Sequence, residues 1–306
     1  MKAVICTKYG PPEVLKIVEI KKPTPKNSHF PTSSFPHLAA IIIPMKEFQN
    51  FTIQLARAAG AVLLEWFEGD FEREIKSTEF DIVTEADKAS DRLVLAEIQA
   101  HYPDHVIWTE ESGYLAGDSP FRWVVDPLDG TTNFAHGVPH FAVSLELQKH
   151  DETILGVVYD PIRDELFWAQ KGAGAWLERE GRPARRLQVT QVTELRSSLL
   201  ATGFPYSRAT TNTYNGPEFQ RVLRRIRGIR RLASPVLDLA YVAAGRFDGY
   251  WEYHLFPWDG AAGALLVTEA GGMVRQLDGS PWHLEALSMV ATNPSFMSTL
   301  RAALRP

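Results

Sequence analysis

The segment WVVDPLDGTTNF, residues 123–134, constrains the fold more than any other part of this 306-residue chain. Its apolar start predicts a buried strand, and Asp126 comes at the end of that strand, where Pro127 fixes the backbone of the departing chain. Asp129 follows shortly after, so two carboxylates project from one turn. A buried strand that leads directly into acids predicts a sheet with charged groups gathered at one edge.

Strand-like and helix-like patterns alternate along the rest of the chain. Apolar residues recur at three- and four-residue steps from residue 46, which predicts a helix that ends near Gly69, and a second helix is expected over 84–101. The pattern restarts after Arg182, with helices expected near 218–227 and over 235–244. We therefore expect a layered α/β (α+β) fold in which two coupled subdomains cover residues 45–185 and 186–306.

Residues 1–44 differ in composition from the remainder. They contain seven prolines and a Ser/Thr/His cluster without helical or strand periodicity. The opening stretch, MKAVICTKYGPPEVLKIVEIKKPTPKN, resembles the first strands of medium-chain dehydrogenases of the quinone oxidoreductase kind, but no G-x-G-x-x-G unit follows it. We interpret 1–44 as a foreign or appended segment, and we disfavour an NADPH-linked oxidoreductase.

Charge and cysteine content narrow the classes of partner. A formal net charge of -5 predicts no nucleic-acid partner, and we interpret the basic run 221–231 as a solvated helix face or a subunit contact. The single cysteine, Cys6, excludes an intramolecular disulfide and fits a reducing compartment. Apolar residues 38–45 are too few to span a bilayer, and no signal peptide is expected. These features predict a cytoplasmic protein that acts on a small molecule, away from membranes.

The acids that follow strands indicate a site for divalent cations. Glu110 and Glu111 follow the apolar stretch HVIW, as Asp126 and Asp129 follow theirs. Adjacent acids repel one another unless cations lie between them, and magnesium prefers oxygen ligands, among which the Leu128 carbonyl is a further candidate.

The residues directly after Asp129 suit a phosphate group. Gly130, Thr131 and Thr132 allow close approach to the backbone and present N–H groups at an expected helix start. The cation site and the anion site would then adjoin.

Each acid also has a purely structural interpretation. Asp126 and Asp129 can form an Asx-type turn that caps the next helix. Thr84 and Asp87 fit a capping box, which spacing alone favours, and Asp259 can cap the helix that it begins. The local patterns leave these alternatives open.

Four ordered motifs carry a family resemblance: DIVTEAD at 81–87, TEES at 109–112, WVVDPLDGTTNF, and WDGAAGALLVTEAGG at 258–272. In order and spacing they resemble the inositol monophosphatase family, over about residues 45–306. The resemblance implies a layered αβαβα sandwich of the inositol monophosphatase and fructose-1,6-bisphosphatase type. It also implies a magnesium-dependent, lithium-sensitive phosphomonoesterase that forms a homodimer.

The resemblance also assigns roles to individual residues. Two or three magnesium ions would be bound by Glu110, Asp126, the Leu128 carbonyl, Asp129 and Asp259. Asp87 and Thr131 would position the attacking water, with Glu111 in support. Substrate contacts would come from Gly130, Thr131, Thr132, Ser234 and Glu252. Lys76 falls where the family often has a lysine, although an exposed lysine is the simpler interpretation.

The substrate itself is less constrained. The family usually has a Gly-Ser/Thr-Ala-Ala segment where this chain has Ala233, Ser234, Pro235 and Val236, and Pro235 has no N–H to offer a substrate hydroxyl. Inositol monophosphate or a similar polyol or sugar phosphate is expected. Fructose 1,6-bisphosphate, histidinol phosphate and NADP are the alternatives, and a non-catalytic descendant is disfavoured because every expected ligand is present.

Overall fold

The computed structural model describes residues 45–67, 69, 73–75 and 82–305, together with the backbone of two N-terminal strands. The chain divides into two compact units, Met1–Ile43 and Pro44–Pro306. In the first unit, β1 (Lys2–Cys6) pairs with β2 (Leu15–Glu19) in antiparallel fashion. Most residues of the stretch that resembles a dehydrogenase, and Lys76, lie outside the described residues.

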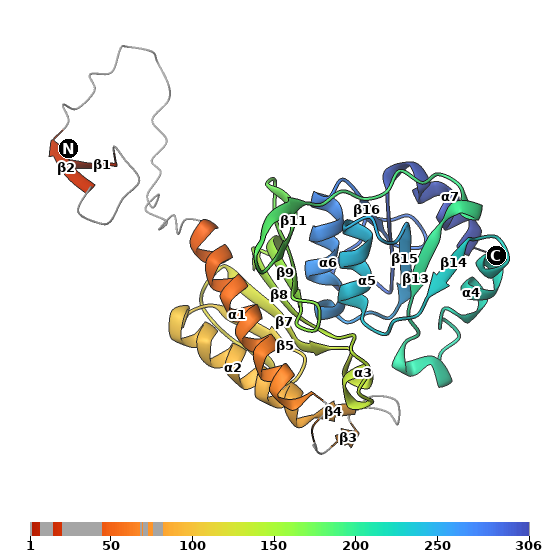
Figure 1. Cartoon of the computed structure of the whole chain (residues 1–306), viewed down its shortest axis with the longest axis horizontal. Coiled ribbons are helices and arrows are strands. Elements are labelled where there is room, and N and C mark those ends of the chain that lie inside the picture. Colours follow the sequence, from red (N-terminus) through yellow and green to blue (C-terminus); the bar gives the residue numbers. More distant parts are fainter. Residues whose placement is uncertain are drawn as a thin grey trace, which may run out of the picture. The chain divides into compact units, whose positions relative to one another are not determined.

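The second unit is built from five layers (Figure 1). The first layer holds two helices, α1 (Met45–Trp66) and α2 (Glu85–His101). They pack on an eight-stranded sheet of order β12-β11-β10-β9-β8-β7-β5-β6. Its strands are, in chain order, β5 (Val106–Thr109), β6 (Gly113–Leu115), β7 (Phe121–Asp129), β8 (Ala142–Lys149), β9 (Glu152–Asp160), β10 (Glu165–Gln170), β11 (Gly174–Arg179) and β12 (Arg182–Arg186).

The middle layer contains α5 (Pro235–Ala243) and α6 (Pro257–Glu269), which pack against each other. The second sheet has the order β14-β13-β15-β17-β16. Its strands are β13 (Leu199–Thr202), β14 (Gly228–Arg230), β15 (Gly249–Tyr253), β16 (Met273–Arg275) and β17 (Ser288–Thr292). The outer helices α4 (Gly216–Leu223) and α7 (Pro294–Leu304) complete the expected αβαβα sandwich.

Apolar side chains of both sheets meet around the middle helices. Val158 and Phe167 of the large sheet and Tyr250 of the small sheet lie in one buried cluster with Leu266 of α6. Since α5 and α6 are covered on both sides, their sequences are apolar almost throughout, unlike the amphipathic α1. The middle layer therefore fixes the two sheets relative to each other.

The helix expected near 218–227 is shorter in the structure. Helix α4 ends at Leu223, and Gly228–Arg230 form β14, which pairs in parallel with β13. Ile226 and Ile229 pack against the outer apolar cluster, so tertiary contacts override the helical tendency of this stretch.

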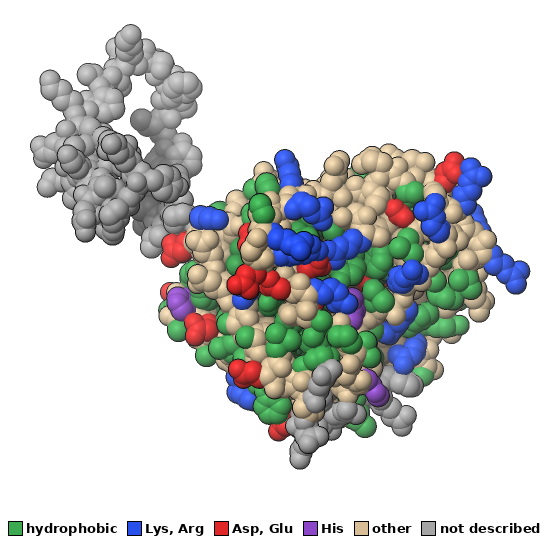
Figure 2. Space-filling view, viewed as in Figure 1, with side chains coloured by type: hydrophobic (Ala, Val, Ile, Leu, Met, Phe, Trp, Pro, Cys, Tyr) green, Lys and Arg blue, Asp and Glu red, His purple; other side chains and the backbone are tan. Residues whose placement is uncertain are grey.

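One of the two edge strands of the large sheet, β12, is basic. All five residues of β12 are exposed, and Arg182, Arg185 and Arg186 are among them. Figure 2 shows Lys and Arg side chains gathered on the viewed face near β11, the partner of β12. Charged side chains on an edge strand oppose the addition of a further strand. None of the described helices is long and apolar enough to cross a membrane.

The small antiparallel pair β3 (Arg73–Ile75) and β4 (Ile82–Thr84) leads into α2, and the short helix α3 (Thr131–Ala135) follows β7. Both α2 and α3 begin directly after a strand end, with Thr84 and Gly130 as their N-cap residues. These two junctions face each other at the site described next, because α3 contacts β4.

Candidate active site

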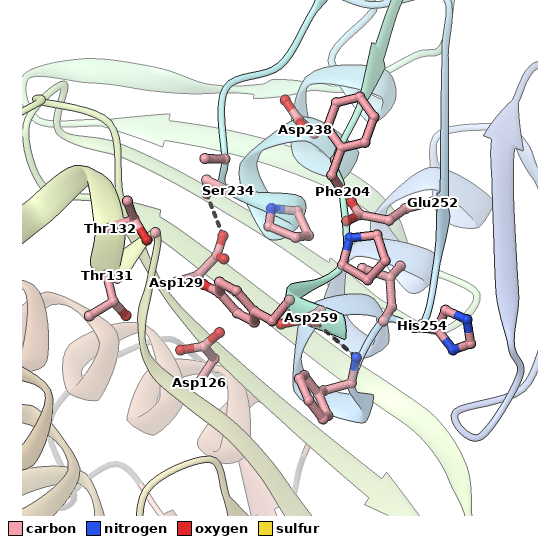
Figure 3. A pocket seen from close by; sticks show the side chains of 18 of the residues that line it. Asp126, Asp129, Thr131, Thr132, Phe204, Ser234, Asp238, Glu252, His254 and Asp259 are labelled. Carbon is pink, nitrogen blue, oxygen red and sulfur yellow. Dashed lines mark hydrogen bonds between the residues drawn. The ribbon is translucent and has the colours of Figure 1, made fainter. Parts of the chain in front are cut away.

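Three carboxylates converge in a cavity of about 570 Å³ that is lined by residues of β7, α5, α6 and the adjoining loops. Asp126, Asp129 and Asp259 each offer an oxygen, and these three atoms lie within 4.8 Å of one another. Figure 3 shows the side chains pointing toward one another, the first two from β7 and the third from α6. Residues more than a hundred positions apart thus share one small volume.

An irregularity in β7 places Asp126 and Asp129 together. In the ladder with β8, Asp126 lies opposite Ser144 and Asp129 opposite Ala142, with a register shift between the two pairs. In a regular strand, residues three apart point to opposite faces. The extra residue of the bulge cancels this alternation, and Pro127, which lacks an N–H, is well suited to such a position.

Two acids of the site also cap helices. Asp259 accepts the backbone N–H of Phe256 at 2.8 Å through Oδ2, at the start of α6. Asp87 accepts the backbone N–H of Thr84 at 2.8 Å through Oδ2, and its Oδ1 accepts the Thr131 hydroxyl at 3.0 Å. Each of these carboxylates thus holds a helix start, and that of Asp87 also accepts the Thr131 hydroxyl.

Most of the residues expected from the sequence line this cavity. They are Glu110, Asp126, Leu128, Asp129, Gly130, Thr131, Thr132, Ser234, Glu252 and Asp259. Asp87 lies behind Thr131 rather than in the lining, and Glu111 is half-buried beside the cavity but does not line it. The Leu128 carbonyl accepts the Thr131 hydroxyl at 3.0 Å.

Burial and the closeness of other acids raise the pKa values of Asp129 and Asp259 in the cavity. Burial raises the pKa of Asp129 to about 7, hydrogen bonds from Ser234 and Val236 oppose this, and the charges of Glu110 and Glu252 add to it. Burial, followed by the charges of Asp129 and Glu110, holds the pKa of Asp259 well above its usual range. Without a cation among them, these carboxylates destabilise one another's charged forms.

The opposite wall of the cavity carries a second pair of buried acids. Burial raises the pKa of Glu252 to about 7, although its carboxylate accepts the Tyr250 hydroxyl. Asp238 is 1% exposed, and its Oδ1 has no hydrogen-bond partner among the described residues. Burial raises the pKa of Asp238, as do the charges of Glu252 and Asp129, whereas Arg231 lowers it.

Several residues that line the cavity are not predicted by any pattern in the sequence. Asp238 was one of them, and its signal was a single acid within the apolar helix α5. Phe204, Tyr206, Arg208 and His254 belong to loops around β13 and β15 and carried no motif. Only the packing of the small sheet brings these loops to the cavity.

The donor atoms fit a hard divalent cation. The three converging ligand groups are carboxylates, Glu110 lines the same cavity, and no sulfur or imidazole belongs to the converging group. An all-oxygen set is what magnesium takes in proteins, and cations would offset both the burial and the mutual repulsion that raise the pKa values of Asp129 and Asp259. Asp126, Asp129 and Asp259 would hold such ions.

Comparisons with known proteins show the family of the chain. The model of the inositol monophosphatase family matches residues 44–306. A protein from Pasteurella multocida named Nus factor SuhB is 42% identical over 265 residues, covering 86% of this chain and 97% of the relative. An inositol-1-monophosphatase from Synechocystis is 44% identical over 248 residues, covering 81% of this chain and 85% of the relative.

Solved structures show the same architecture. The extragenic suppressor protein SuhB from Bartonella henselae has a TM-score of 0.79 at 38% identity, covering 85% of this chain and 98% of its own. Inositol monophosphatase from Anabaena has a TM-score of 0.75 at 41% identity, covering 85% of this chain and 96% of its own.

Proposed function

We propose that this chain, which belongs to the inositol monophosphatase family and is a phosphatase, hydrolyses the phosphate monoester of a small polyol or sugar with magnesium ions. The convergence of Asp126, Asp129 and Asp259 within 4.8 Å carries this proposal. A capping role alone does not explain it, because a cap needs one acid at one helix, whereas here acids from β7 and α6 meet.

The residues around the acids have distinct tasks in this proposal. Bound magnesium would neutralise the phosphate and lower the pKa of a water molecule. The Thr131 hydroxyl, held between Asp87 and the Leu128 carbonyl, would orient the attacking water. The backbone N–H groups of Gly130 and Thr131 would donate to the phosphate oxygens. Glu111 would support Glu110 from beside the cavity.

The alcohol part of the substrate would lie against the opposite wall. There, Glu252 would accept a hydroxyl of the substrate, and Pro235 would present a ring without a hydrogen-bond donor. The DGTTN motif favours inositol monophosphate or a similar polyol or sugar phosphate over a nucleotide. We further propose a homodimer in the cytoplasm, as the family resemblance implies.

Asp126→Asn tests the metal-bound site directly. We expect turnover to fall on the order of 10³-fold or more, because the ligands act as a unit and the amide removes one negative charge from it. Phosphate release with and without magnesium measures this. Glu269→Gln is the matched control. Glu269 lies at the other end of α6, and its carboxylate accepts the backbone N–H groups of Gly172 and Gly174. An Asp126→Asn enzyme that kept most of its magnesium-dependent rate would refute the proposal.

A substrate panel tests the choice of alcohol. Inositol monophosphate, fructose 1,6-bisphosphate, histidinol phosphate and NADP would be compared by phosphate release, each with and without lithium. The highest kcat/KM is expected for inositol monophosphate or another polyol phosphate. Preference for NADP would contradict the assignment of the opposite wall.

A second role is suggested by the relatives named Nus factor, whose name points to transcription. Such a role would not depend on hydrolysis. The Asp126→Asn variant would be expressed in a strain that lacks this protein and has a transcription defect. If the variant had no phosphatase activity but still corrected the defect, the two roles would be separate.

A further inference from the structure

Ser234 occupies an unusual position for a serine at a helix start. It is the N-cap residue of α5, where a serine side chain normally accepts a backbone N–H of the first turn. Here the side chain makes no capping bond, and its hydroxyl instead donates to Oδ2 of Asp129 (Figure 3). Ser234 is 0% exposed, so its hydroxyl is committed to the carboxylate.

The carboxylate of Asp129, which belongs to the large sheet, caps the start of α5 instead. The backbone N–H of Val236, in the first turn of α5, donates to the same Oδ2 of Asp129 at 3.1 Å. A negative charge at a helix N-terminus is stabilised by the helix dipole. Asp129 therefore does for α5 what Ser234 would ordinarily do.

A further contact holds the two segments together. The Asn133 amide, in α3, donates to the backbone carbonyl of Leu232 at 2.7 Å and to that of His140 at 2.8 Å. The segment that contains Asp129 and α3 is thus joined to the segment at the start of α5 at two points, through Asp129 and through Asn133. Two donors therefore hold Oδ2 of Asp129, and an oxygen of the same carboxylate lies within 4.8 Å of oxygens of Asp126 and Asp259.

We propose that Ser234 is a positioning residue for Asp129 and sets the orientation in which this carboxylate binds a cation. The inference rests on the proposed function, and it replaces the expectation that Ser234 contacts the alcohol of the substrate. Groups that hold a metal ligand from behind fix its orientation, and their loss commonly lowers metal affinity or activity by about 10- to 100-fold.

Metal binding can be measured apart from catalysis. Mn²⁺ serves as the probe, and titration followed by electron paramagnetic resonance counts the free ion. We expect Ser234→Ala to lower Mn²⁺ affinity by about 10-fold or more and to raise the magnesium concentration for half-maximal activity in parallel. Ser234→Thr, which keeps the hydroxyl, should recover most of this affinity. KM at saturating magnesium should change little.

Ser198→Ala is the matched control, because Ser198 is also 0% exposed and donates to a backbone carbonyl, that of Leu195, outside the cavity. Thermal melts in EDTA show whether each variant folds. If Ser234→Ala failed to fold, the comparison of Ser234→Thr with the unchanged protein would decide: equal Mn²⁺ affinity supports the proposal, and a 10-fold loss overturns it.

Other outcomes separate the two proposals. Unchanged Mn²⁺ affinity in Ser234→Ala with a raised KM would overturn the positioning role and return Ser234 to the substrate. Failure of the unchanged protein to bind Mn²⁺ at all would instead refute the proposed function.

Discussion

Single carboxylates in this protein serve two purposes at once. Asp87 caps α2 through Oδ2 and accepts the Thr131 hydroxyl through Oδ1. Asp259 caps α6 through Oδ2, and its carboxylate also converges with those of Asp126 and Asp129. A carboxylate has two oxygens with about four acceptor sites, so the structural and the catalytic interpretations of these acids do not exclude each other.

Ala233 shows local strain next to the site. Its φ of 61° is in the left-handed region, which costs a residue with a Cβ about 1–2 kcal/mol. It directly precedes Ser234, whose hydroxyl reaches Asp129. Strain of this kind persists where surrounding contacts determine the backbone, and it often accompanies function.

Glu146 should make stability depend on pH. Burial raises the pKa of its carboxyl to about 7, despite hydrogen bonds from Thr153 and Gln148. Between pH 4.5 and 7 the unfolded chain loses this proton while the folded protein keeps it, so the free energy of unfolding falls as pH rises. Glu146→Gln removes this effect, and its stability relative to the unchanged protein should improve by about 2 kcal/mol from pH 5 to pH 8.

Urea denaturation in EDTA at the two pH values would measure this difference. If the free energies of unfolding of the two proteins differed by the same amount at both pH values, the Glu146 carboxyl would already be ionised at pH 5.

At the scale of elements, close packing between α6 and β9 controls where Asp259 lies. A Cβ added at Gly156 would come within 3.0 Å of the Ala262 backbone. Ala262 follows Asp259 by one helical turn, so a shift of α6 there would move the carboxylate away from Asp126. The small residues of this interface thus bear on the geometry of the site.

Gly156→Val should therefore reduce both stability and activity. We expect a loss of about 1–3 kcal/mol in the free energy of unfolding from overpacking, together with a turnover per folded molecule that falls severalfold. Gly156→Ala should show a smaller change in the same direction. Denaturation and phosphate release would be measured on the same samples, and a destabilised protein with full turnover would show that α6 does not transmit the shift.

At the scale of the whole molecule, the site exists only where layers meet. Asp126 and Asp129 come from the large sheet, Asp259 from the middle layer, and Glu252 from the small sheet. Neither sheet alone contains the full set of groups. The apolar cluster that joins both sheets through α5 and α6 therefore maintains the active site as well as the fold.

Residues 1–44 should be dispensable for this assembly. Helix α1 begins at Met45, and the family model matches from residue 44. A chain that starts at Met45 should differ by less than about 1 kcal/mol in the free energy of unfolding, since it keeps all of the second unit except Pro44. Its turnover should match that of the full chain. Loss of folding or activity would show that residues 1–44 belong to the enzyme.

The family, the alternation of strands and helices, and the acids in DPLDGTTN and WDGAAG could all be predicted from residue type and spacing, because these features are local. The sequence did not show that the Ser234 hydroxyl donates to Asp129, or that Asp238 lies in the cavity wall. Those outcomes depend on a bulge in β7 and on the packing of α5 and α6 between two sheets. Such contacts join residues far apart in the chain, and no local pattern records them.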